Sequence, residues 1–143
     1  MSQENVEIVR KLYADWAQGN FTRAGYFDPE VEFQWIWPSA GQWTALAQRV
    51  ADAEGRVHGL EQLNAVWLDW LRTWDRFTVE AEELVEVDDR VLVLYRRRAR
   101  MRGTDSTIEQ EGATLWTLRD GKLVQGLDFG ERAKALEAAG LAK

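Results

Sequence analysis

The sequence predicts an α+β fold in which a mainly antiparallel sheet packs against helices from the first half of the chain. Residues 91–102 alternate in polarity with period two, which is typical of a strand. Apolar residues within 2–16 and 60–74 recur every three or four positions, as they do along one face of a helix. The triplet Arg119-Asp120-Gly121 is typical of a tight turn between neighbouring strands. In chain order these patterns predict a helix, a strand, a second helix, four consecutive strands and a terminal helix.

The bulk composition indicates one soluble globular domain over residues 1–143, which is long enough to bury a core. The net charge of −6 argues against a nucleic-acid partner, because phosphates need a basic surface. With one histidine and no cysteine, we expect neither a disulfide nor a zinc site, and we expect no other metal and no cofactor. The sequence has no apolar run of membrane-spanning length and no signal-peptide core, so we expect a cytoplasmic protein without a membrane partner.

The first helix is predicted to begin after Ser2, whose hydroxyl can cap its N-terminus, and to end at Gly19-Asn20. Its apolar stripe predicts the side of the helix that enters the core. The stripe consists of Val6, Val9, Tyr13 and Trp16.

The next stretch predicts a short helical turn at 21–26, a turn at Asp28-Pro29, and a first strand over 31–37 that Pro38 ends. Residues 39–57 have no clear periodicity. They are either a surface loop or a lid over a pocket, since loops often carry such functions.

The second helix is predicted over 60–74, after Gly59, and it is strongly amphipathic. Its stripe either packs against the sheet or in part faces a ligand. The stripe consists of Leu63, Trp67, Trp70, Leu71 and Trp74. Strands are then predicted over 77–87, 91–102, 107–118 and 122–130, followed by a helix over 131–139 that Gly140 ends.

The register of the four strands follows from the turns and from keeping apolar residues on one face. This places Val87 opposite Val91, Arg102 opposite Thr107, and Leu118 opposite Lys122. One face then carries a row of arginines between two rows of glutamates, which is either a solvated surface or a dimer contact. The arginines are Arg96, Arg98, Arg100 and Arg102.

The other face combines apolar and polar residues around two glycines. In the predicted register Gly112 lies between Arg97 and Asp128, and Gly126 lies beside Thr114. Glycines leave room above a sheet, and a hollow with a few convergent polar groups is the usual form of a small-molecule site. The same register also places Glu83, Ile108 and Val124 on this face.

Several phrases along the chain resemble those of the SnoaL-like group of the NTF2-like superfamily. They are ENVEIVRKLYADWAQGN, YFDPEVEF, HGLEQLNAVW, LWTLRDGKLVQ and ERAKALEAAGL. The resemblance implies a strongly curved mixed sheet wrapped around the helices as a cone, a pocket at its open end, and a homodimer through the sheet.

The superfamily includes ketosteroid isomerases, polyketide cyclases, limonene epoxide hydrolase and scytalone dehydratase, so function has to be argued from the site. The isomerase pattern is missing, because the base, tyrosine and acid positions of that family fall at about Phe33, Leu12 and Thr114. SnoaL-type cyclases likewise carry a catalytic aspartate near Thr114, which is absent here. Their aspartate in the last strand matches Asp128. For the aspartate–arginine–aspartate cluster of the epoxide hydrolase, only Arg97 and Asp128 are candidates.

Three functions remain open. In the first, the protein is an enzyme on a small hydrophobic molecule, with Asp128 as general acid or base and Arg97 holding its ionised form or a substrate anion. The same two residues would otherwise form a structural ion pair. In the second, a tryptophan-rich wall binds an aromatic ligand without catalysis. In the third, side chains fill the hollow of a structural or regulatory dimer. The expected ligand-binding residues are Trp35, Trp37, Tyr13, Trp67, Tyr95, Gln110, Thr114, Trp116 and His58.

Overall fold

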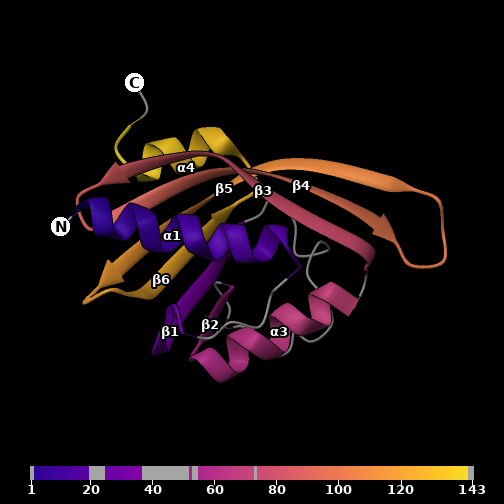
Figure 1. Cartoon of the computed structure of the whole chain (residues 1–143), viewed down its shortest axis with the longest axis horizontal. Helices are drawn as coiled ribbons and strands as arrows, with labels where there is room; N and C mark the ends of the chain where they lie inside the picture. Colours follow the sequence, from indigo (N-terminus) through magenta and orange to yellow (C-terminus); the bar gives the residue numbers. More distant parts are fainter. Residues whose placement is uncertain (1, 20–24, 37–51, 53–54, 73, 142–143) are drawn as a thin grey trace.

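The computed structural model of the chain describes residues 2–19, 25–36, 52, 55–72 and 74–141, which hold three helices and six strands (Figure 1). The elements in chain order are α1 (Ser2–Ala17), β1 (Phe27–Ile36), β2 (Arg56–His58), α3 (Leu60–Arg72), β3 (Trp74–Val87), β4 (Arg90–Met101), β5 (Thr107–Arg119), β6 (Lys122–Phe129) and α4 (Arg132–Ala138).

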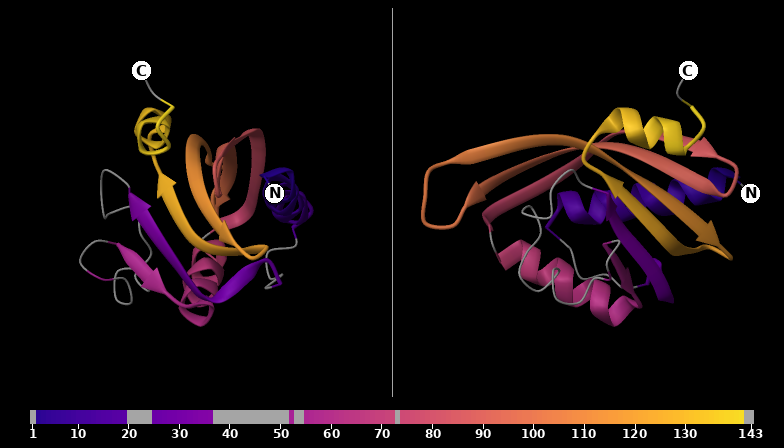
Figure 2. Two further views of the ribbon diagram at one scale, coloured as in Figure 1. Left: turned by 90° about the vertical axis from the view of Figure 1, so that its left-hand side faces the viewer. Right: turned by 180° about the vertical axis from the view of Figure 1, so that it is seen from behind.

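The strands form one sheet with the order β2-β1-β6-β5-β4-β3. β1 and β6 run parallel, and every other neighbouring pair in this sheet is antiparallel. The sheet curves strongly, with α1 and α3 on its concave side and α4 on its convex side (Figure 2). The predicted α+β fold with a curved, mainly antiparallel sheet is therefore confirmed.

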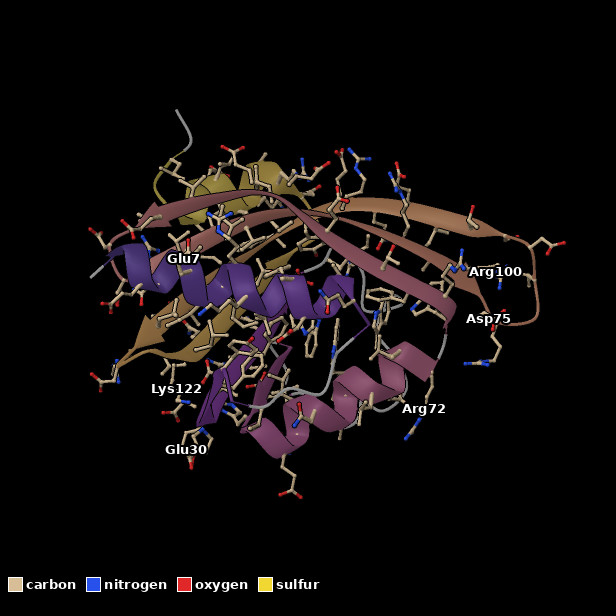
Figure 3. All side chains as sticks on the ribbon, viewed as in Figure 1. Glu7, Glu30, Arg72, Asp75, Arg100 and Lys122 are labelled. Carbon is tan, nitrogen blue, oxygen red and sulfur yellow. The ribbon has the colours of Figure 1, made fainter. Side chains whose placement is uncertain are left out.

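The main core lies between α1 and the concave face of the sheet. The apolar stripe predicted for the first helix does face this core, because Val9 and Tyr13 are buried and Val6 and Trp16 pack against them. A smaller core lies under α4 on the convex face. It contains Leu92, Ala113, Leu115, Phe129, Ala135 and Ala139. Charged side chains such as Glu30, Arg72 and Lys122 lie at the periphery (Figure 3).

The second helix ends earlier than the sequence predicted. α3 stops at Arg72, and Trp74 is the first residue of β3, so the expected stripe is divided between a helix and a strand. Arg102 stabilises this corner, since its Nε donates to the carbonyl of Arg72 at 3.1 Å and its Nη2 donates to the carbonyl of Trp74 at 3.3 Å. A cation at the last carbonyls of a helix is favourable for the helix dipole.

The predicted register of β3 against β4 is wrong. Asp88-Asp89 is a two-residue turn with Asp88 at φ 58°, so Val87 pairs with Arg90 rather than with Val91. A bulge between Ala81 and Glu83 shifts the pairing again, which brings Glu80 opposite Arg96. Bulges of this kind leave an extra residue on one strand and reverse the faces beyond it.

This bulge explains where the next side chains lie. Ala81 and Leu84 both pack against the main core, although the strict alternation of a strand would put them on opposite faces. Glu83, which was expected on the concave face, is exposed. Val85 and Val87 pack instead against the smaller core on the convex face.

The predicted registers of β5 are wrong by one or two residues. Tyr95 pairs with Gly112, and Thr114 pairs with Asp128. A second irregularity, between Thr117 and Leu118, shifts the pairing of β5 with β6. The β4–β5 hairpin extends beyond the rest of the sheet (Figure 1), so Ile108 is 40% exposed rather than part of a concave apolar face.

Arg96 and Arg98 of the predicted arginine row lie among glutamates as expected, whereas Arg100 pairs with Asp75 and Arg102 binds backbone carbonyls. Arg96 contacts the carboxylates of Glu82, Glu109 and Glu111 at 3.0, 2.7 and 2.6 Å. Arg98 shares Glu109 at 2.7 Å. These pairs neutralise the convex face beside α4.

Some predictions fall outside the described residues: the helical turn at 21–26, Trp37, and nearly all of the loop or lid at 39–57. At the end of that last stretch the structure adds an edge strand, β2, which the sequence did not predict. Among the helices of the described chain, none is long and apolar enough to cross a membrane.

Candidate functional site

Asp128, near the end of β6, is the centre of a buried hydrogen-bond network on the concave face. Only 4% of the residue is exposed. Its Oδ1 accepts a hydrogen bond from the hydroxyl of Tyr95 at 2.6 Å and another from the hydroxyl of Thr114 at 3.1 Å. Hydrogen bonds to a carboxylate are short and strong, so this network fixes both donors. The sequence predicted all three residues, but not that they touch.

Gly112 explains how Tyr95 reaches the carboxylate. A Cβ at Gly112 would lie 2.6 Å from the hydroxyl oxygen of Tyr95 and 3.0 Å from the carbonyl oxygen of Phe129. The absent side chain therefore leaves room for the phenol. This room was expected to hold a ligand, but the side chain of Tyr95 fills it.

Gly126 has the same relation to two other aromatic rings. A Cβ there would lie 2.6 Å from the indole of Trp116 and 2.7 Å from the ring of Phe33. Neither glycine opens a hollow at its own position. Both allow aromatic side chains to approach the backbone of the sheet closely.

Tyr13 extends the network toward α1. Its hydroxyl oxygen accepts a hydrogen bond from Nε1 of Trp116 at 3.1 Å. Burial raises the pKa of Tyr13 well above its usual value, and the hydrogen bonds of Trp116 and Thr114 oppose that rise. Burial, followed by the negative charge of Asp128, also raises the pKa of Tyr95. Both phenols therefore stay protonated at neutral pH; Tyr95 donates to Asp128, whereas Tyr13 accepts from Trp116.

Arg97 lies beside this network and is only 8% exposed. Its guanidinium lies 4.9 Å from the ring centroid of Tyr95 and 5.7 Å from that of Trp70. Its Nη2 donates to Oε1 of Gln110 at 3.1 Å. The predicted cation is therefore inside the protein, between an aromatic ring of β4 and one of α3, which is a favourable setting for a guanidinium. Its positive charge opposes the rise that burial causes in the pKa values of Tyr13 and Tyr95, so it acts electrostatically on the network around Asp128.

Aromatic rings from α1, α3, β1 and β3 form a wall next to these polar groups. Trp67 of α3 lies 5.3 Å from Trp16 and 5.9 Å from Phe77, measured between ring centroids. Trp35 lies 4.8 Å from Phe33. Trp35 and Trp67 are half-buried, so part of each ring is accessible.

His58, the remaining predicted ligand-binding residue, lies elsewhere. It is on the edge strand β2 opposite Glu32, whereas Val57 shares the face of Phe33. The His58 side chain is 60% exposed, and its Nδ1 and Nε2 lie 3.3 Å from Glu32 and 3.8 Å from Asp52. The alternation of β2 therefore places it on the opposite face of the sheet from Phe33 and Asp128.

Two further aromatic residues belong to this site. Trp70, part of the helical stripe expected in part to face a ligand, contacts Arg97. Phe33, which was not predicted as a ligand-binding residue, fills the space above Gly126 and could have been found from its spacing. Trp70 follows Trp67 by one helical turn, and Phe33 precedes Trp35 by two positions on a strand.

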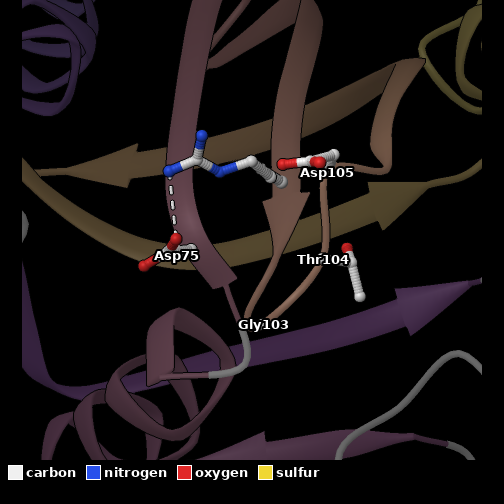
Figure 4. Close-up of a pocket in the computed structure, with 5 residues that line it drawn as sticks. Asp75, Gly103, Thr104 and Asp105 are labelled. Carbon is white, nitrogen blue, oxygen red and sulfur yellow. Dashed lines mark hydrogen bonds and ion pairs between the residues drawn. The ribbon is translucent and has the colours of Figure 1, made fainter.

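The structure also has an open groove of about 330 Å³ at the turn that connects β4 and β5 (Figure 4). Asp75, Arg100, Gly103, Thr104 and Asp105 line it. Its main polar contact is an ion pair between Arg100 and Asp75 at 3.0 Å. None of its lining residues belongs to the site predicted from the sequence. Over the described residues, no group of three or more His, Cys, Asp or Glu is placed to hold a metal ion.

Comparisons with known proteins agree with this fold. A family model described as a SnoaL-like domain matches residues 9–126. A protein of Jannaschia sp. CCS1 assigned as a SnoaL-like polyketide cyclase is similar in structure, with TM-score 0.71, 19% identity, and coverage of 99% of this chain and 94% of that chain. AclR of Streptomyces galilaeus, assigned as a hydroxylase, has TM-score 0.70 at 13% identity, with both chains covered completely (100% and 100%). TerC, co-crystallised with polyporic acid, has TM-score 0.66 at 21% identity, with 96% of this chain and 98% of that chain covered. No curated protein matches the sequence.

Proposed function

The chain belongs to the SnoaL-like domain family and has the NTF2-like fold, and from this premise we propose that it is an enzyme that transfers a proton on a small aromatic or polycyclic molecule. The observation that carries the proposal is the buried carboxylate of Asp128, which accepts hydrogen bonds from Tyr95 and Thr114 beside a wall of aromatic rings. Polar groups that converge next to aromatic surface are typical of ligand sites in proteins.

The proposed chemistry assigns one role to each group. Asp128 takes a proton from a carbon next to a carbonyl group of the ligand and returns it at another atom, as a general base and then a general acid. Tyr95 donates a hydrogen bond from its hydroxyl to Asp128 and so orients the carboxylate, while the protonated hydroxyl of Tyr13 donates a hydrogen bond to the ligand oxygen that becomes negative. Arg97 stabilises negative charge in the same region. Trp35 and Trp67 stack against the apolar body of the ligand.

Similar structures support the ligand class. One of them is assigned as a polyketide cyclase, and another was crystallised with polyporic acid. We therefore propose polyporic acid and polycyclic aromatic ketones as the first compounds to test with this protein.

The experiment compares Asp128→Asn with the wild-type protein. Binding is measured by quenching of tryptophan fluorescence, and turnover is measured by mass spectrometry of the products. We expect Asp128→Asn to bind with a dissociation constant within about tenfold of the wild-type value and to lose at least about 100-fold in turnover, the usual contribution of a general acid or base. Glu83→Gln is the matched control, since Glu83 is an exposed carboxylate. Unchanged turnover in Asp128→Asn would reject the proposed role.

A non-catalytic binding module is the second candidate, and one observation favours it. Tyr95, Trp116 and Phe33 occupy the space above the two glycines, which leaves less of the interior to a substrate. This candidate predicts fluorescence quenching by the same compounds with no product from any of them. A protein that binds none of them would fit the structural role instead.

We further propose that the protein acts in the cytoplasm as a homodimer. The convex face beside α4 supports the dimer, because its arginines and glutamates alternate across β3, β4 and β5. Such a face is complementary to a second copy of itself turned by a twofold rotation.

A further inference from the structure

We infer that Arg132 is a positioning residue for the Tyr95–Asp128 hydrogen bond, which it holds in place from the opposite face of the sheet. The functional importance of this inference rests on the proposed function, whereas its structural content can be tested without a ligand. Arg132 is the first residue of α4, on the convex side of the sheet.

Arg132 makes two contacts with the backbone of the sheet. Its Nη2 donates to the carbonyl oxygen of Tyr95 at 2.7 Å, and its Nε donates to the carbonyl oxygen of Gly112 at 3.2 Å. Tyr95 and Gly112 face each other in the register of β4 and β5. One rigid, planar guanidinium therefore bridges the two strands at the place where the phenol crosses the glycine.

Two carboxylates hold the guanidinium of Arg132 in place. Its Nη2 contacts Oε1 of Glu82 at 2.6 Å, and its Nη1 lies 3.5 Å from Oε2 of Glu111. Glu82 lies in the bulge of β3, between Ala81 and Glu83, so the bulge directs this carboxylate toward the arginine. The Arg132 side chain is 27% exposed, so these contacts are only partly open to water.

On the concave side of the same residues lie the Tyr95 ring and its hydrogen bond to Asp128. The ring of Tyr95 lies so close to Gly112 that a Cβ there would overlap it, and the Tyr95 hydroxyl is 2.6 Å from Asp128. A small slide of β4 along β5 would move the hydroxyl away from the carboxylate. Losses of rate from displacements of about 1 Å are common in active sites, which is why supporting contacts matter.

The chain itself completes the arrangement. Arg132 follows Asp128 by four residues, and Phe129 between them is buried under α4. The segment 128–132 therefore fixes both groups. It holds the carboxylate of Asp128 through the backbone, and it holds the phenol of Tyr95 through the guanidinium of Arg132. Arg132 therefore couples the start of α4 to the geometry of the buried site.

The test uses the resonance of Tyr95 in protein labelled with ¹³Cζ-tyrosine. The chain has three tyrosines, and Tyr95→Phe assigns the signal of interest. Asp128→Asn gives the direction of the shift when the hydroxyl loses its charged acceptor. We expect Arg132→Gln to move the Tyr95 signal in that direction. Arg132→Lys, which keeps the charge but lacks the planar fork, is expected to give an intermediate shift.

Arg98→Gln is the matched control. Arg98 lies on the same face and contacts Glu109 at 2.7 Å, but its side chain is 66% exposed. We expect this variant to leave the Tyr95 signal in place. An unchanged Tyr95 signal in folded Arg132→Gln would overturn the inference, and so would an equal shift in Arg98→Gln. If Arg132→Gln does not fold, Arg132→Lys decides in the same way. Failure of the wild-type protein to bind any test compound would count against the proposed function alone, since the resonance comparison contains no ligand.

Discussion

At the scale of single residues, the interior depends on hydroxyl groups that donate to one carboxylate. Tyr95 and Thr114 both donate to the same oxygen of Asp128, from two neighbouring strands. A buried acceptor that loses its donor keeps the cost of being removed from water without the compensating bond. The contribution of each hydroxyl to the free energy of unfolding therefore depends on its burial as much as on the length of its hydrogen bond.

Tyr95→Phe tests this dependence. The substitution removes the hydroxyl at 2.6 Å from Asp128 and leaves the rest of the ring in place. We expect a loss of about 1–3 kcal/mol in the free energy of unfolding, measured by urea denaturation. Tyr26→Phe is the control, since Tyr26 donates to Asp15 at 2.7 Å in a part-buried setting and its loss should cost about 1 kcal/mol. Equal losses in both variants would contradict the importance of burial.

Gly112→Ala tests the fit between the glycine and the phenol. The new methyl group would lie 2.6 Å from the hydroxyl oxygen of Tyr95, with backbone of Phe129 at 3.0 Å on another side. Because the backbone limits the room, the Tyr95 ring has to move, and we expect a destabilisation of about 1–3 kcal/mol in urea denaturation.

The control for this substitution is Gly25→Ala. A Cβ at Gly25 meets no heavy atom within 4 Å, so the change should stay within about 0.5 kcal/mol. A Gly112→Ala protein as stable as Gly25→Ala would show that the phenol adjusts without cost, and would weaken the case for a rigid site.

The residues of the site could be predicted from the sequence better than their contacts. Alternation along β4, β5 and β6 identifies Tyr95, Thr114 and Asp128 as residues of one face, and the structure agrees. Which of them touch depends on the register to within one residue. The turn after β4 is longer than predicted, so Thr107 pairs with Arg100 rather than with Arg102, and an irregularity at Thr117 shifts β5 against β6; no feature of the sequence marks either.

At the scale of elements, the bulge of β3 links three parts of the fold, namely β3, β4 and α4. It brings Glu82 within 2.6 Å of Arg132 on α4 and within 3.0 Å of Arg96 on β4.

Helices and long strands were predictable, because their periodic patterns extend over many residues. The edge strand β2 was not, because three residues are too few to show a period. The end of α3 was misplaced, because Trp74 continues the helical stripe while belonging to β3.

The charge network predicts how stability depends on pH. The hydrogen bonds from Arg132 and Arg96 lower the pKa of Glu82 below its ordinary value of 4.5. The hydrogen bonds from Arg98 and Arg96 do the same for Glu109. A carboxylate with a lowered folded-state pKa stabilises the fold above its unfolded-state pKa, and this contribution is lost as the pH falls through the folded-state pKa. The midpoint of urea unfolding should therefore decrease as the pH falls below about 4.5.

Glu82→Gln isolates the contribution of one carboxylate to this pH dependence. The variant cannot ionise at position 82, so its decrease in stability below about pH 4.5 should be shallower than that of the wild-type protein. Added salt should reduce the difference, because these groups are near the surface. Identical pH profiles for the two proteins would mean that the network does not stabilise the fold.

At the scale of the whole molecule, the sheet divides the protein into two unlike sides. The concave side holds the aromatic rings and the buried network, and the convex side holds α4 and the ion pairs. Arg132 connects the two through contacts with the backbone of β4 and β5. A second copy of the chain bound on the convex face would therefore lie one sheet thickness from Asp128, and pairing could influence the site without reaching it.

The proposed dimer leads to a prediction about association. If the convex face pairs with itself, its charges should make association dependent on salt, with more monomer at high ionic strength. Sedimentation velocity at a series of protein and salt concentrations measures the monomer–dimer equilibrium. Arg98→Glu places a negative charge beside Glu109 on this face, so it should weaken association by about tenfold or more, since like charges across an interface repel. Lys11→Glu, an exposed reversal on α1, should leave association unchanged. A protein that is monomeric at every concentration would exclude the dimer. Equal effects of the two charge reversals would place the contact on another face.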